Sequence, residues 1–171
     1  TKKNNMSDTT TEEKKTIITT GTCMCGAVKI TITGEPIITL VCHCEDCRKF
    51  TGSINMATLW PATCVKIEGE TKVHERKQGT ISLRTFCPKC GGPVVNDHSQ
   101  SHLKAYDFPA GVLDIKEDDG SLKTNWFKPA MHVYYKESIW NIKDGLPKFL
   151  GLPQAFLPEG QTEEKVPEDQ W

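Results

Sequence analysis

The fold is decided by two short stretches, Cys23-Met24-Cys25-Gly26 and Cys87-Pro88-Lys89-Cys90-Gly91. A third stretch, Cys42-His43-Cys44-Glu45-Asp46-Cys47, brings the clustered cysteines to seven of the chain's eight. Thiols two or three residues apart can bind one ion, whereas a disulfide between them would be strained. The glycines after the first two stretches allow the tight turns that aim backbone N–H groups at a thiolate. The sequence therefore predicts a zinc protein.

The pairs Cys23/Cys25 and Cys87/Cys90 are predicted to form one structural zinc site. Each pair adjoins a predicted strand, and each is followed by glycine. Structural zinc takes four such ligands in a tetrahedron, which two pairs supply together. The alternative is that they are unrelated pairs of buried thiols.

Cys42, Cys44 and Cys47 are one ligand short of a closed site. Catalytic zinc commonly has three protein ligands and an open position, so we predict a second, catalytic zinc here. The alternative is a purely structural site whose fourth ligand is a distant histidine, for which His132 is the best candidate. His43 lies between two ligands and is expected to point away from the metal.

The charge of the three-cysteine site suggests what it could bind. Three thiolates around Zn²⁺ leave a net charge of −1 and make the metal a poor Lewis acid, which suits holding a soft sulfur ligand better than splitting water. Arg48, Lys49 and Lys89 lie beside the clusters and could offset negative charge. We predict that Arg48 and Lys49 bind the carboxylates of an anionic thiol, with His132 as a further substrate contact.

Composition excludes several other classes of protein. The chain of 171 residues suits one domain with a core, and its net charge of −1 gives no basic footprint for nucleic acid. No apolar run is long enough to span a membrane, and no signal peptide is recognisable. Free, clustered thiols are typical of reducing compartments, so we expect a cytoplasmic protein.

Short alternating or β-branched runs predict a mainly β domain with little helix. The one predicted helical segment is 45–50. In the run 80–86, Ile81 and Leu83 lie on one face and Ser82 and Arg84 on the other. The predicted strands are 27–33, 37–41, 54–60, 65–67, 80–86, 103–106, 112–115, 131–135 and 138–142.

The ends of the chain differ in composition from its middle. We predict a polar tail at 1–16, a zinc domain at 17–156 and an acidic, flexible tail at 157–171. Met6 is a candidate natural start, with residues 1–5 added ahead of it. His98 and His102 flank a serine-rich loop and are expected to be solvated, and Cys64 is assigned no role.

The order of these motifs resembles the glutathione-dependent formaldehyde-activating enzyme family, also called the CENP-V/GFA domain. The resemblance is carried by the three cysteine stretches, by Arg48-Lys49 with Gly52-Ser53 after the second, and by 110–114 and 144–149 downstream. It runs from about Thr20 to Phe149.

The resemblance implies an Mss4-like fold of several small coiled antiparallel sheets stapled by zinc. It implies a structural zinc on Cys23, Cys25, Cys87 and Cys90, and a catalytic zinc on Cys42, Cys44 and Cys47. It implies a carbon–sulfur lyase of the S-(hydroxymethyl)glutathione synthase type, whose substrates are a thiol such as glutathione and an aldehyde. The alternative is a non-catalytic zinc-binding module that binds a protein; the sequence does not give the oligomeric state.

Overall fold

A computed structural model describes residues 17–76, 82–116, 120–121 and 127–164. Within this part of the chain the fold is mainly β, as predicted, with one α-helix and four short 3-10 helices. The strands are β1 (Ile18–Thr22), β2 (Lys29–Thr33), β3 (Ile38–Cys42), β4 (Asn55–Pro61), β5 (Val65–Glu68), β6 (Lys72–His74), β7 (Leu83–Phe86), β8 (Pro93–His98), β9 (Ala105–Pro109) and β10 (His132–Val133). The helices are α1 (Glu45–Thr51), η1 (Ala62–Cys64), η2 (Ala110–Val112), η4 (Tyr135–Glu137) and η5 (Gln154–Phe156).

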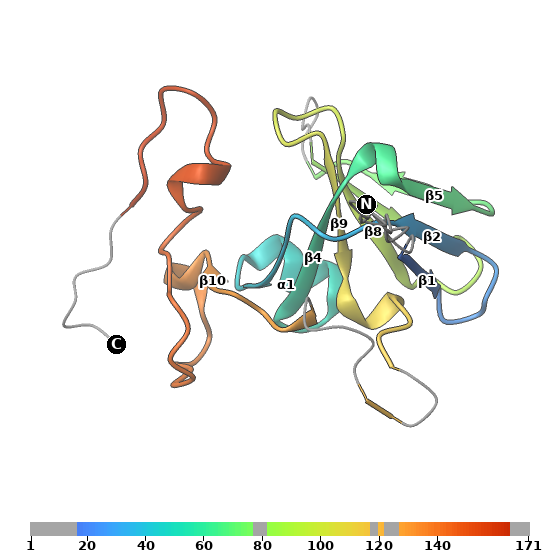
Figure 1. The fold of residues 1–171 in the computed structure, drawn as a ribbon, viewed down its shortest axis with the longest axis horizontal. Coiled ribbons are helices and arrows are strands. Elements are labelled where there is room, and N and C mark those ends of the chain that lie inside the picture. Colours follow the sequence, from blue (N-terminus) through green and yellow to red (C-terminus); the bar gives the residue numbers. More distant parts are fainter. Residues whose placement is uncertain (1–16, 77–81, 117–119, 122–126, 165–171) are drawn as a thin grey trace, which may run out of the picture.

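The strands form two sheets. The smaller has the order β1-β2-β5, and the larger has the order β10-β3-β4-β9-β8-β7-β6. All pairs are antiparallel except β10 with β3. Figure 1 shows the small sheet on one side of the larger sheet and the C-terminal segment on the other, beyond α1. The architecture is consistent with an Mss4-like fold, although the larger sheet is wider than the small sheets predicted.

The main core lies between the two sheets. Alternation in β2 buries Ile30 and Ile32, which belong to one cluster with Trp60 of β4, Val94 of β8 and Phe108 of β9. Cys23 and Cys87 belong to the same buried cluster. The four-cysteine site therefore lies at the edge of this core, with one buried thiol from each of its two turns and with Cys25 exposed.

Several predicted strands differ from those observed. Residues 112–115 are wrong as a strand, because the 3-10 turn η2 ends there and leaves an isolated bridge between Leu113 and Gly21. Residues 138–142 also form no strand, and the strand at 131–135 shrinks to β10. Residues 80 and 81 of another predicted strand lie outside the described residues. No helix in the described part of the chain has the length and apolarity needed to cross a bilayer.

Candidate metal centre and active site

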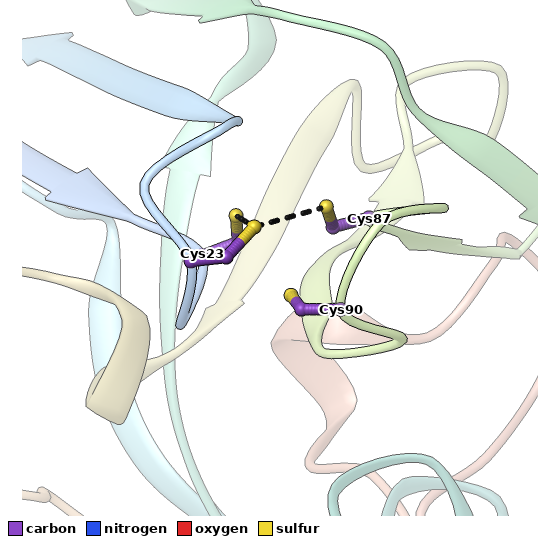
Figure 2. Close-up of side chains that lie close together, drawn as sticks. Cys23, Cys87 and Cys90 are labelled. Atoms are coloured by element: carbon purple, nitrogen blue, oxygen red, sulfur yellow. Dashed lines mark hydrogen bonds between the residues drawn. The ribbon is translucent and has the colours of Figure 1, made fainter.

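The four-cysteine cluster joins two turns that are distant in sequence. Cys23 and Cys25 lie between β1 and β2, and Cys87 and Cys90 lie between β7 and β8. Figure 2 shows the thiols of Cys23, Cys87 and Cys90 gathered across the gap between the two turns. The four Sγ atoms all lie within 4.8 Å of one another. The structure thus brings together the pairs that the sequence predicted as one site.

Both turns use the same backbone pattern. The Gly26 N–H donates to the carbonyl of Cys23 at 2.9 Å, and the Gly91 N–H donates to that of Cys87 at 2.8 Å. Both glycines have positive φ, 72° and 70°, which a residue with a side chain rarely adopts. The Val28 N–H also donates to Cys23 Sγ at 3.3 Å, a bond that favours the thiolate.

The sulfur spacing suits zinc. Cys25 Sγ lies 3.6 Å from Cys23 Sγ and 3.9 Å from Cys87 Sγ. Two sulfurs of a tetrahedral zinc are about 3.8 Å apart, given Zn–S bonds of about 2.3 Å. The donor set and its spacing therefore fit a closed, structural site.

The three-cysteine cluster forms where β3 runs into α1. Cys42 ends β3, Cys44 caps α1, and Cys47 lies in the first turn of that helix. Cys42 Sγ lies 3.4 Å from Cys44 Sγ, which also accepts the Cys47 N–H at 3.3 Å. Among the described residues, the side chains of this cluster within 4.8 Å of one another are the three cysteines, without an imidazole.

The three thiols titrate together. Hydrogen bonds from Cys42 and Cys47 lower the pKa of Cys44 to about 2, and the same sharing raises the pKa of Cys42 well above its usual value. A metal ion would take all three as thiolates and release the remaining protons.

His43 and His132 form a buried chain with Asp144. His43 Nε2 lies 2.8 Å from His132 Nδ1, and His132 Nε2 lies 2.8 Å from Asp144 Oδ2. Burial lowers the pKa of His43 to about 4, and the hydrogen bond from His132 lowers the pKa of Asp144 to about 2. Both ring nitrogens of His132 therefore bond to His43 and Asp144 and not to the sulfurs, and the His43 ring points toward His132.

Arg48 and Lys49 do not line the pocket beside the cysteines. Arg48 Nη1 donates to the backbone carbonyls of His43 and Glu137, which fastens α1 to the segment after β10. Lys49 pairs with Glu45 at 2.9 Å, and 71% of its side chain is exposed. In this structure both side chains therefore make contacts within the protein. Their role in binding a substrate remains a prediction.

A pocket of about 610 Å³ opens beside the three cysteines, all of which line it. Its apolar wall includes Leu40, Leu59, Leu103, Val133, Leu152 and Phe156. Its cationic and imidazole side chains are Arg76, Arg84, His98 and His102.

The prediction that His98 is solvated is wrong, because its ring is half-buried in this wall. The sequence signal for Arg84 was its place on the polar face of the run 80–86.

Replacing His98 with glutamine should flatten part of the dependence of stability on acid pH. Burial, with a smaller effect of Arg84, lowers the pKa of His98 to about 4. Between pH 6.5 and 4 the unfolded chain binds a proton that the folded chain does not, so the free energy of unfolding falls as pH falls. We expect a contribution of about 1 kcal/mol, reduced by partial exposure of the ring.

The measurement is urea unfolding at pH 7 and pH 4.5 for wild type and His98→Gln. His74→Gln, at an exposed position in β6, is the matched control. An unchanged difference between the two pH values in His98→Gln would contradict the burial of the neutral ring.

The family model described as glutathione-dependent formaldehyde-activating enzyme matches residues 18–137. The chain belongs to this family. The matched span contains all seven clustered cysteines, but it ends before Leu152 and Phe156 of the pocket wall.

Among solved structures, a Rhodobacter sphaeroides protein is similar to this family member. Its TM-score is 0.47 and its sequence identity is 21%, over 60% of this chain and 96% of that chain. The search of curated proteins gives no match.

Proposed function

We propose that the protein is a zinc-dependent carbon–sulfur lyase that makes or breaks the bond between a thiol sulfur and a carbonyl carbon. Glutathione and formaldehyde are the substrates that the family description suggests. The observation that carries the proposal is the difference between the two sulfur clusters. One has four ligands, two of them buried in the core between the sheets, and the other has three ligands in the wall of a pocket.

A set of three ligands leaves one position for an incoming group. Cys42, Cys44 and Cys47 all line the pocket, so a small thiol entering it can approach that position. Zinc held there would favour the thiolate form of the substrate near neutral pH. We therefore assign two zinc ions per chain, a structural one to Cys23, Cys25, Cys87 and Cys90 and a catalytic one to the three-cysteine cluster.

The residues of the chain supply position and environment. The apolar wall, with Leu40, Leu59 and Val133, excludes water from the reacting atoms and strengthens electrostatic contacts inside the pocket. Arg84 lines the same pocket as the three cysteines and brings positive charge to it. Two reactants held together in this way react as one bound pair, which is the main gain for a thiol that adds to aldehydes without help.

Replacing Cys44 with serine tests this function. We expect the variant to stay folded and to keep one zinc per chain, because the four-cysteine cluster is untouched. Its kcat/KM for breakdown of a thiol–aldehyde adduct should fall more than about a hundredfold. Loss of a residue that only hydrogen-bonds to a metal ligand typically costs about 10- to 100-fold, and loss of a ligand should cost more. The measurements are zinc content, steady-state turnover of S-hydroxymethylglutathione, and the same assays on Cys64→Ser, a cysteine outside both clusters.

A Cys44→Ser variant that holds one zinc and turns over the adduct at the wild-type rate would rule out this mechanism. A wild-type protein with one zinc, and no response of that zinc to glutathione, would favour the non-catalytic module.

A further inference from the structure

Three polar side chains lie in one row across the larger sheet. In the pairing of β7 with β8, Arg84 lies opposite Asn96, and in the pairing of β8 with β9, Asn96 lies opposite Asp107. Directly paired residues project from the same face of a sheet. Arg84 and Asp107 line the pocket that holds the three cysteines, and fully buried Asn96 lies between them.

Each member of the row has a buried polar atom without a partner among the described residues. These atoms are Arg84 Nε, Asn96 Oδ1 and Asp107 Oδ1. Buried polar groups are normally paired, so unpaired ones need an explanation. Here a donor and two acceptors belong to one row of the sheet, and two of the three residues line the pocket, so a group able both to accept and to donate a hydrogen bond would suit them.

Asn96 connects this row to the sulfur cluster. Its Nδ2 donates to Asp107 Oδ2 at 3.0 Å and lies 4.0 Å from Cys47 Sγ. The amide therefore fixes the Asp107 carboxyl at a set position relative to the sulfurs. Arg84 is held from the other side, with Nη1 donating to Ser82 Oγ at 2.8 Å and the guanidinium 5.9 Å from the Phe50 ring.

We propose that Asp107 is the general acid and base for the hydroxyl group of the thiol–aldehyde adduct, with Asn96 as its positioning residue and Arg84 as donor to the same oxygen. This inference rests on the proposed function. It identifies the group that moves the proton, which neither the cysteines nor the His43–His132 pair provides inside the pocket.

The proton and electron balance is complete without a further reactant. In breakdown, the Asp107 carboxylate takes the hydroxyl proton, the carbon–oxygen bond becomes double, and the carbon–sulfur bond breaks with its electron pair leaving on sulfur. In formation, the thiolate adds to the carbonyl carbon, and the Asp107 carboxyl gives its proton to the oxygen. Arg84 Nε–H donates to that oxygen in both directions.

The surroundings of Asp107 suit this work. Burial, with a smaller effect of the Cys44 thiolate, raises the pKa of Asp107 to about 6, while the Asn96 hydrogen bond and the charge of Arg84 act in the opposite direction. A carboxyl that titrates near neutral pH is effective as both acid and base. β4 contributes apolar Leu59 opposite Asp107. The other titratable or charged side chains that line the pocket are Cys42, Cys44, Glu45, Asp46, Cys47, Arg76, Arg84, His98, His102, Tyr134 and Glu137.

The experiment combines turnover with an equilibrium measurement on the zinc-loaded protein. Asp107→Asn keeps the shape of the side chain and its contact with Asn96 but carries no proton to transfer, and Asp107→Leu removes the polar contact. Asp97→Asn, the same change at a position outside the pocket that bonds the Ser99 N–H, is the control. The binding probes are 2-mercaptoethanol and ethanethiol, which differ by the hydroxyl.

We expect kcat/KM of Asp107→Asn for adduct breakdown to fall about 10²- to 10⁴-fold. In wild type and Asp97→Asn this rate should increase with pH around pH 6, as the Asp107 carboxyl loses its proton. In Asp107→Asn this increase should be absent. Wild type should bind 2-mercaptoethanol at least tenfold more tightly than ethanethiol, and Asp107→Leu should bind the two alike.

A rate for Asp107→Asn within threefold of wild type overturns the proposal. If wild type loaded with two zinc ions turns over no adduct, the proposed function has failed, and binding decides the role of Asp107. A hydroxyl preference that Asp107→Leu abolishes then supports the row as a hydroxyl-binding site, and a preference that is missing or that survives in Asp107→Leu overturns it.

Discussion

Replacing Cys87 with serine is expected to leave most of the chain unfolded, even with zinc in excess. Cys87 is fully buried, and its sulfur lies 3.9 Å from that of Cys25 on the turn beside the small sheet. Binding of structural zinc contributes on the order of 10 kcal/mol to folding in zinc-finger peptides, whereas a whole domain is stable by about 5–15 kcal/mol. Losing one of four zinc ligands should therefore remove most of the free energy that separates the folded from the unfolded domain.

Circular dichroism, thermal unfolding and zinc content would measure this loss. Cys64→Ser is the matched control, because Cys64 is partly exposed and belongs to neither cluster, and its stability should change by less than about 1 kcal/mol. A Cys87→Ser protein that melts within a few degrees of wild type would show that the four sulfurs do not hold a structural metal.

Replacing His132 with leucine is expected to weaken the three-cysteine site without touching a cysteine. The change leaves His43 Nε2 and Asp144 Oδ2 without their partner. Unpaired buried groups cost about 1–3 kcal/mol each, and His43 is fully buried. Since His43 lies between Cys42 and Cys44, its release should loosen the loop that sets the spacing of those two sulfurs.

Because Asp144 is exposed, the expected loss in the free energy of unfolding is that of one buried group, about 1–3 kcal/mol. At a chelator concentration that leaves two zinc ions on the wild type, the variant should keep only one. His74→Leu, at an exposed position, should do neither. A His132→Leu protein that keeps both ions and its stability but loses turnover would support His132 as a substrate contact. An altered visible spectrum of the cobalt-substituted protein, with the fold intact, would support it as a ligand.

The parts of the site that depend on neighbouring residues could be predicted from the sequence. Thiols two or three residues apart must share one turn, so the clusters at Cys23/Cys25, Cys42/Cys44/Cys47 and Cys87/Cys90 follow from spacing. The helix at 45–50 was also predicted, and α1 begins at Glu45. The side-chain contacts of Arg48 and Lys49 did not follow from their position next to Cys47, because successive residues of a helix are rotated by about 100°.

Features that depend on strand register were beyond the sequence. Nothing in a single strand tells that Arg84, Asn96 and Asp107 share a row, since this follows from pairing between β7, β8 and β9. The strand predictions for the region after β10 were wrong for a similar reason. Its backbone bonds reach across the chain, as from the Tyr134 N–H to the Gly151 carbonyl and from the Tyr135 N–H to the Phe149 carbonyl, and these pairs follow no local period.

The C-terminal part of the pocket wall has a consequence for how relatives diverge. The family match ends at residue 137, yet Leu152 and Phe156 lie in the wall, and the Phe156 carbonyl lies 3.0 Å from His102 Nε2, which also lines the pocket. Irregular surface segments tolerate substitution and insertion far better than paired strands do. Substitutions in this segment alone could thus change which molecules enter the pocket, while the three cysteines and their chemistry stay the same.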